Sequence, residues 1–197
     1  MHVDAELLSE FVPKPLVTHA EAERIEQARS QTRRKSFVLG RSVLRLLVAE
    51  ILGVDPQTIQ VGVRPDGSLY LIDLPGSISL SHSGNSAAAV FSERSVGIDI
   101  EEVKPRRDDL YTYVLHRDEY DLLSDSGLEN NEATILFWTL KEAVLKGRRS
   151  GLRHSPKDVR LDIDFDSRKG LAVVGGEEEW TVVYERLSDK FQSIAFR

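Results

Sequence analysis

The sequence predicts an α+β protein of two lobes, because one order of elements occurs twice along the chain. Within 197 residues, a helical region followed by short strands fills the first half, and a second helical region followed by strands fills the other. This length allows two small lobes with buried cores, and the apolar share of 41 % is ordinary for a folded protein. No repeat of residues accompanies the pattern, so the duplication rests on element order alone.

The first half is expected to open with a long helix. Residues 20–52 show apolar side chains at close to a 3.6-residue period, with a break near 30–32. Gly53 ends this helix, and Pro56 follows it. The strands expected after it are 59–63, 69–72, 78–81 and 87–91.

The second half is expected to open with a strand at 96–100, joined to the preceding strand by a polar hairpin turn at 92–95. We place the lobe boundary in this turn, which gives an N-terminal lobe of residues 1–94 and a C-terminal lobe of residues 95–197. The other expected elements are helices at 108–115, 117–123 and 132–147, and strands at 159–163, 171–174, 180–184 and 192–196.

Composition argues against several functional classes. A net charge of −6 does not suit a general nucleic-acid binder. The chain has no apolar run long enough to span a membrane and no signal-like segment near its start, so we expect a cytoplasmic protein that does not bind membranes. The absence of cysteine excludes disulfides and thiolate metal sites. Basic residues still cluster at 33–45 and at 104–107, which suits a small phosphorylated ligand.

Two acidic residues share one face of the strand at 96–100. Successive side chains of a strand point to opposite faces, so Asp99 and Glu101 lie together while the alternating apolar residues enter the core. Gly97 lies on the acidic face and would let a ligand approach the backbone. An isolated pair of this kind is more often a solvated sheet edge than a site.

A helix further along the chain offers another acid together with two lysines. Glu142 and Lys146 are four residues apart and face the same way, and Lys141 is their neighbour around the helix. Alone, such a pair is usually a solvated surface contact. Combined with Asp99 and Glu101, Glu142 would complete three oxygen ligands for Mg²⁺, and the lysines would neutralise phosphate charge.

Three segments, in this order, resemble the Sfp-type 4′-phosphopantetheinyl transferase family. They are Ile-Ser-Leu-Ser-His-Ser at 78–83, Val-Gly-Ile-Asp-Ile-Glu at 96–101 and Phe-Trp-Thr-Leu-Lys-Glu-Ala-Val-Leu-Lys at 137–146. The helix at 33–50 and the turn at 151–156 are also similar to the family. The resemblance extends over residues 20–197, which is nearly the whole chain.

The resemblance implies two pseudo-symmetric α+β lobes that bind coenzyme A in the cleft between them, in a chain that needs no partner subunit and is expected to be a monomer. Asp99, Glu101 and Glu142 would hold Mg²⁺, and Glu142 would also deprotonate the attacking serine, directly or through water. Lys141 and Lys146 would stabilise the pyrophosphate. The implied reaction transfers 4′-phosphopantetheine to a serine of an apo acyl or peptidyl carrier protein and releases 3′,5′-ADP.

The resemblance also implies which side chains bind the coenzyme. His82 would bind its 3′-phosphate, and Glu119 matches a further acidic position near the site. Family members often carry Gly-Lys-Pro on the turn before the Ser-His segment, where this chain has Asp-Gly-Ser-Leu at 66–69. Arg64 is expected to reach the phosphate that the missing lysine would bind. The implied coenzyme-binding residues are His82, Ser81, Arg33, Arg41, Arg64, Lys141 and Lys146.

Two other interpretations remain open. The missing Gly-Lys-Pro motivates a degenerate module that binds coenzyme A or a carrier protein without chemistry. A hydrolase could use the same three acids with water as the nucleophile. For a transferase, the surface that meets an acidic carrier helix is expected to include Lys104, Arg106, Arg107 and the loop at 125–131.

Overall fold

A computed structural model describes the fold over residues 5–12, 14–27, 30–106, 109–149 and 154–197. The expected long helix is two helices, α1 (His19–Glu26) and α2 (Gln31–Leu52). Ser30 caps the start of α2, because its hydroxyl accepts a hydrogen bond from the Arg33 amide. Gly53 ends α2 in the left-handed conformation, as the sequence indicates.

The remaining elements follow the expected order, with two additions, a strand β1 and a short 3₁₀ turn η3. The strand β1 at the start of the chain was not expected from the sequence, and the helix expected at 117–123 is a 3₁₀ turn, η1 (Arg117–Glu119), followed by α4. No helix among the residues covered by the structure is long and apolar enough to cross a bilayer. The strands of the first half are β1 (Ala5–Ser9), β2 (Val61–Val63), β3 (Leu69–Leu71), β4 (Ser77–Ser83) and β5 (Ser86–Ser92). The elements of the second half are β6 (Val96–Glu102), α3 (Asp109–Val114), α4 (Tyr120–Asp125), α5 (Asn130–Arg148), η3 (Pro156–Asp158), β7 (Val159–Asp164), β8 (Lys169–Val174), β9 (Glu178–Leu187) and β10 (Lys190–Phe196).

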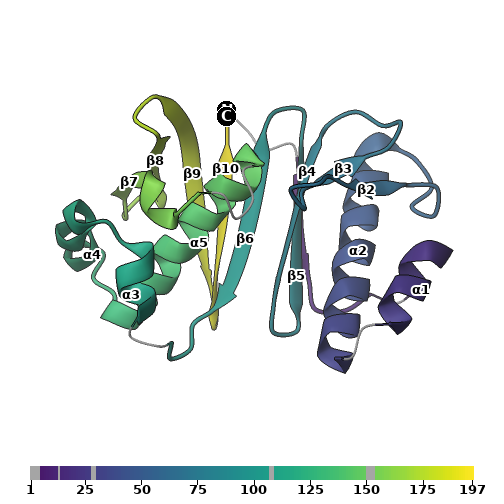
Figure 1. Cartoon of the computed structure of the whole chain (residues 1–197), viewed down its shortest axis with the longest axis horizontal. Coiled ribbons are helices and arrows are strands. Elements are labelled where there is room, and N and C mark those ends of the chain that lie inside the picture. Colours follow the sequence, from purple (N-terminus) through teal and green to yellow (C-terminus); the bar gives the residue numbers. More distant parts are fainter. Residues whose placement is uncertain (1–4, 13, 28–29, 107–108, 150–153) are drawn as a thin grey trace.

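The molecule is built in four layers, which Figure 1 shows as helix, sheet, sheet and helix. One antiparallel sheet has the order β1-β5-β4, the other has the order β6-β10-β9-β8-β7, and β2 and β3 form a separate hairpin. The helix α2 covers the outer face of the first sheet, and α5 covers the outer face of the second. Both lobes therefore share a layer order, although their sheets have three and five strands. The division into domains at residues 94 and 95 stays a prediction.

The side chains of β5 point alternately toward α2 and toward the second sheet, so this strand contacts both neighbouring layers. Ala87, Ala89 and Phe91 pack toward α2, whereas Ala88 and Val90 pack toward the second sheet. The second group belongs to an apolar cluster shared by both lobes. Its other buried members are Val96, Ile98, Ile100, Ile194 and Phe196.

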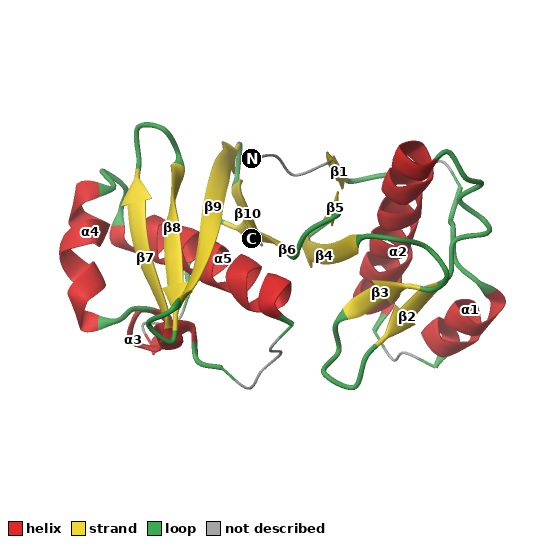
Figure 2. Cartoon of the chain, turned by 90° about the horizontal axis from the view of Figure 1, so that it is seen from above, coloured by secondary structure: helices red, strands yellow, loops and turns green. Residues whose placement is uncertain are grey.

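The strands β4 and β6 meet at the middle of the molecule as edge strands of different sheets (Figure 2). Serines on β4 satisfy polar groups of β6. Ser79 Oγ accepts a hydrogen bond of 3.2 Å from the Ile98 amide, and Ser83 Oγ accepts one of 3.1 Å from the Glu102 amide. Ser81 lies between them and donates to Asp99. This serine row, Ser79, Ser81 and Ser83, ties the two lobes together along one edge.

The helix α5 lies very close to β6, at a pair of glycines. A Cβ atom on Gly97 would overlap the carbonyl oxygen of Ala143 and the backbone nitrogen of Gly147. Gly97 therefore admits the helix rather than a ligand, so the expected ligand approach at this glycine is wrong. The close contact brings the residues of α5 near the acidic face of β6.

Replacing Gly97 with alanine should lower the free energy of unfolding by about 3 kcal/mol or more, because the helix must move away from the strand. Chemical denaturation measures the loss. The control is Gly127→Ala: Gly127 has a φ of 68° and nothing within 4 Å of an added Cβ, so only backbone strain of about 1 kcal/mol should appear. Equal losses in the two variants would show that close packing is not the role of Gly97.

Candidate active site

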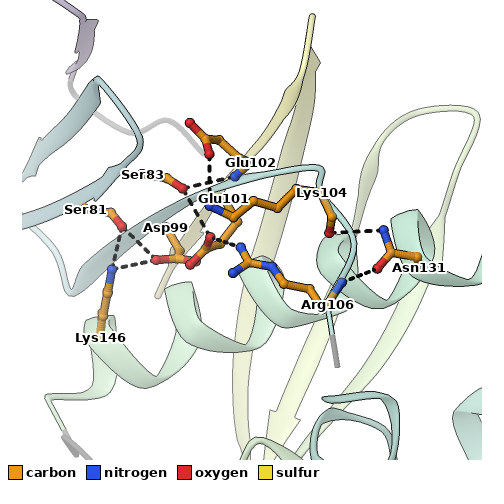
Figure 3. A network of polar contacts seen from close by, with 9 residues as sticks. All are labelled: Ser81, Ser83, Asp99, Glu101, Glu102, Lys104, Arg106, Asn131 and Lys146. Carbon is orange, nitrogen blue, oxygen red and sulfur yellow. Dashed lines mark hydrogen bonds and ion pairs between the residues drawn. The ribbon is translucent and has the colours of Figure 1, made fainter. Parts of the chain in front are cut away.

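Asp99 lies at the seam between the lobes, where β6, β4 and α5 meet (Figure 3). The residue is only 4 % exposed. Its Oδ1 accepts a hydrogen bond of 2.6 Å from Lys146 Nζ and one of 2.8 Å from Ser81 Oγ. Its Oδ2 is buried and has no hydrogen-bond partner within the described part of the chain. A buried carboxylate oxygen without a donor is costly, so this atom is suited to an added cationic partner.

Glu101 lies two residues along the same strand face, as alternation predicts. Its Oε2 accepts hydrogen bonds from Arg106 Nη2 at 2.6 Å and from Ser83 Oγ at 3.2 Å. Burial raises the pKa of Glu101, and the nearby charge of Asp99 raises it further, whereas Arg106 and Ser83 oppose the increase. The two acids of β6 therefore interact electrostatically.

Glu142 on α5 is the third acid of this region. We call Asp99, Glu101 and Glu142 together the acidic group. Burial raises the pKa of its carboxyl, Asp99 and Glu101 add to the increase, and Lys146 opposes it. The three carboxylates thus interact through their charges in one region of the molecule. No three acidic, histidine or cysteine side chains among the described residues are arranged to hold a metal ion. Lys146 and Arg106 instead bind two of the carboxylates, so convergence of the three on one ion stays a prediction.

Lys141 and Glu119 lie apart from this acidic group, in the core of the second lobe. The Lys141 side chain is 0 % exposed, and its Nζ donates to Glu119 Oε2 at 2.6 Å and to the Val114 carbonyl at 3.0 Å. Glu119 also accepts hydrogen bonds from the amides of His116 and Leu161. In this structure Lys141 therefore does not reach the region expected for the pyrophosphate. The pair instead fastens α5 to η1 and β7.

A hollow of about 670 Å³ collects three of the expected coenzyme-binding residues. Arg33 and Arg41 come from α2, His82 comes from β4, and Lys104 follows β6, so both lobes contribute. We call this the basic hollow. Arg41 is only 5 % exposed, and its Nη1 has no hydrogen-bond partner in the ranges that the structure covers. A buried donor at the wall of a basic hollow suits an anionic ligand.

Arg64 does not line the basic hollow. Its Nη1 donates to the Leu69 carbonyl at 2.9 Å, and its guanidinium lies 4.7 Å from the Tyr70 ring centre. Arg149 is a cation that the sequence reasoning missed. It lines a smaller hollow with Lys146 and the turn at 66–69, but it simply follows α5 and belongs to no motif.

The expected partner surface is described only in part. Lys104 pairs with Glu102, and Arg106 pairs with Glu101. Asn131, which was expected in a loop at 125–131, lies in the first turn of α5 and bonds the backbone of residues 104 and 106. Arg107 and residues 151–153 of the expected turn lie outside the described residues.

A model of the 4′-phosphopantetheinyl transferase superfamily matches residues 95–195, which include β6, α5 and every acid discussed above. The chain belongs to this superfamily. The match confirms the family resemblance, and the mixed helix and sheet architecture agrees with it.

Individual relatives of the superfamily match at moderate identity. A 4′-phosphopantetheinyl transferase of Bacillus subtilis is 28 % identical over 143 residues, which are 72 % of this chain and 64 % of the relative. The transferase Sfp of Bacillus subtilis strain 168 is 28 % identical over 117 residues, 58 % of this chain and 52 % of the relative. The crystal structure of holo-[acyl-carrier-protein] synthase from Thermotoga maritima is 22 % identical, with a TM-score of 0.44, over 52 % of this chain and 61 % of that one. The chain thus spans between half and two thirds of the length of these relatives.

For this superfamily member, Lys141→Met should lower the free energy of unfolding by about 3 to 5 kcal/mol, because it leaves Glu119 buried without its cation. Chemical denaturation measures the change. The double variant Glu119→Gln/Lys141→Met should recover part of the loss, since no charge remains buried. A fully stable Lys141→Met protein that has lost only coenzyme binding would show instead that Lys141 acts on phosphate.

Proposed function

We propose that this chain transfers the 4′-phosphopantetheine group of coenzyme A to a serine of an apo acyl or peptidyl carrier protein, giving holo carrier protein and 3′,5′-ADP. The observation that carries the proposal is the grouping of Asp99, Glu101, Glu142 and Lys146 at the lobe seam. Superfamily membership and the adjacent basic hollow support it. We also propose a cytoplasmic monomer that binds neither nucleic acid nor membranes, in line with its net charge of −6.

We propose that the acidic group binds a divalent cation, although its three acids are not arranged around an ion in this structure. Its donors are carboxylate oxygens, which hard cations such as Mg²⁺ prefer, and Asp99 Oδ2 is buried without a donor in the part of the chain described. Burial is the main cause of the raised pKa values of Glu101 and Glu142, and repulsion from the neighbouring carboxylates adds to the increase. Asp99, Glu101 and Glu142 would hold the ion, which would supply positive charge to the pyrophosphate of the coenzyme.

Glu142 and Lys146 are proposed to act in the transfer step itself. Glu142 accepts the proton of the carrier serine, directly or through water. The serine oxygen then bonds to the phosphorus nearest the pantetheine, and the bond from that phosphorus to the bridging oxygen breaks. Lys146, which bonds Asp99, would neutralise the charge of the departing 3′,5′-ADP.

The basic hollow is proposed to hold the 3′-phosphate of the coenzyme. His82 and Arg33 are exposed at its surface, and Arg41 presents a buried donor at its wall. Ser81 and Lys146, which both bond Asp99, are proposed to contact the phosphates of the coenzyme beside the acids. This placement gives the ends of the coenzyme separate charged contacts, which favours one orientation of the ligand.

Glu142→Gln should abolish transfer, with a fall of at least about 10³-fold, because the base is lost. The intact mass of an apo carrier incubated with coenzyme A and Mg²⁺ reports transfer, and circular dichroism reports the fold. Glu50→Gln, at an exposed position on α2, should transfer at the normal rate. Full transfer by Glu142→Gln would remove Glu142 from the mechanism. Coenzyme binding by the wild-type protein without transfer to any of several carriers would favour the non-catalytic module.

His82→Ala should weaken coenzyme A binding about 10- to 100-fold, the expected loss of one hydrogen bond to a charged phosphate. Binding of dephospho-coenzyme A, which lacks the 3′-phosphate, should not change. Titration calorimetry measures both constants, and His19→Ala serves as control because that side chain is 91 % exposed on α1. Equal weakening for both ligands would contradict the assignment.

A further inference from the structure

Arg106 binds Glu101 and is itself held in a defined position just after β6 (Figure 3). Its Nη2 lies 2.6 Å from Glu101 Oε2. Its backbone amide donates to Asn131 Oδ1 at 3.3 Å, and Asn131 Nδ2 donates to the Lys104 carbonyl at 3.3 Å. Both bonds anchor the backbone that carries Arg106 to the start of α5. Two hydrogen bonds therefore connect the backbone next to this ion pair to α5.

The Arg106 side chain has room to leave Glu101 without moving this backbone. It lines a hollow of about 370 Å³ together with Glu101, Leu110 and Trp138. It also lines a neighbouring hollow of about 580 Å³ together with Tyr111 and Thr134. The side chain is 31 % exposed, so a rotation about its own bonds can carry the guanidinium from one position to the other.

We propose that Arg106 is a tethered cation that occupies Glu101 in the metal-free protein, moves into the adjacent hollows when a divalent cation binds, and so sets the metal affinity. The proposal rests on the assignment of Glu101 as a metal ligand in the proposed function. The guanidinium charge beside Glu101 repels an incoming cation, and its bond occupies one of the several acceptor sites of the carboxylate. The charge of Arg106 therefore opposes metal binding, and movement of its side chain into the adjacent hollows relieves the repulsion.

Lys146 holds Asp99 in a similar way, but the two cations differ in their surroundings. Lys146 also bonds Ser81 and lines the hollow beside the turn at 66–69, where the phosphates of the coenzyme are expected. Among the described residues, the Arg106 guanidinium bonds Glu101, and the side chain lines the two hollows described above. Arg106 belongs to none of the three segments that carry the family resemblance.

The test measures Mn²⁺ binding directly, without coenzyme or carrier, by electron paramagnetic resonance of the free ion. Arg106→Gln should bind Mn²⁺ about 5- to 10-fold more tightly than the wild-type protein, the fold-change expected when one half-buried ion pair no longer competes. Circular dichroism confirms that the variant folds.

The matched control is Arg186→Gln. Arg186 is 32 % exposed and pairs with Glu132 at 2.7 Å, so it has the same burial and ion-pair length but no contact with the acidic group. Unchanged affinity in this control, with tighter binding in Arg106→Gln, supports the proposal. Equal affinities of Arg106→Gln and wild type would overturn it, as would equal tightening in both variants or no measurable Mn²⁺ binding by any of them. A chain that shows the expected pattern but transfers nothing would contradict the transferase proposal alone.

Discussion

The contact between β4 and β6 is the constraint on which the site depends. Two edge strands of separate sheets lie side by side because the serine row presents small hydroxyl groups rather than bulky side chains. The same row satisfies backbone amides that an edge strand would otherwise leave exposed. Since Ser81 bonds Asp99, the contact that joins the lobes also orients one acid of the site. The hydroxyl of Ser81 thus both joins the lobes and holds a residue of the proposed active site.

The acidic group itself is unfavourable for folding. Its three acids interact in a partly buried region, and Asp99 Oδ2 has no donor among the described residues. Lys146 and Arg106 offset this cost in the absence of a metal. Functional sites commonly contain such local conflicts, while the surrounding core supplies the stability. Here that core includes the close contact of β6 and α5 at Gly97 and Gly147.

Much of the fold could be predicted from periodicity. The alternation in β6 correctly separates its acidic face from its apolar face, and the 3.6-residue period correctly identifies α2 and α5. β1 escaped prediction because a five-residue edge strand carries too little pattern. The break in the first helical region was expected near residues 30–32, whereas α1 ends at Glu26 and α2 begins at Gln31.

The direction of a side chain could be predicted where it depends on a single helix or strand. It could not be predicted where it depends on packing between elements. Glu142 and Lys146 share a helix face, so their joint approach to Asp99 follows from spacing. Lys141, one residue away, points into the core, because Glu119 arrives there from a different element. Arg64 likewise bonds the nearby Leu69 carbonyl and does not line the basic hollow, an orientation that local spacing does not reveal. Such contacts depend on the tertiary structure.

The apolar cluster shared by the two sheets has a consequence for how the chain unfolds. Separation of the lobes would expose the apolar side chains of both sheets to water at the same time. These are Ala88 and Val90 in one lobe and Ile98, Ile100 and Ile194 in the other. Each lobe alone would expose a hydrophobic sheet face to water. The two lobes therefore unfold as one cooperative unit. A destabilising substitution in either lobe lowers the midpoint temperature of unfolding of the whole chain.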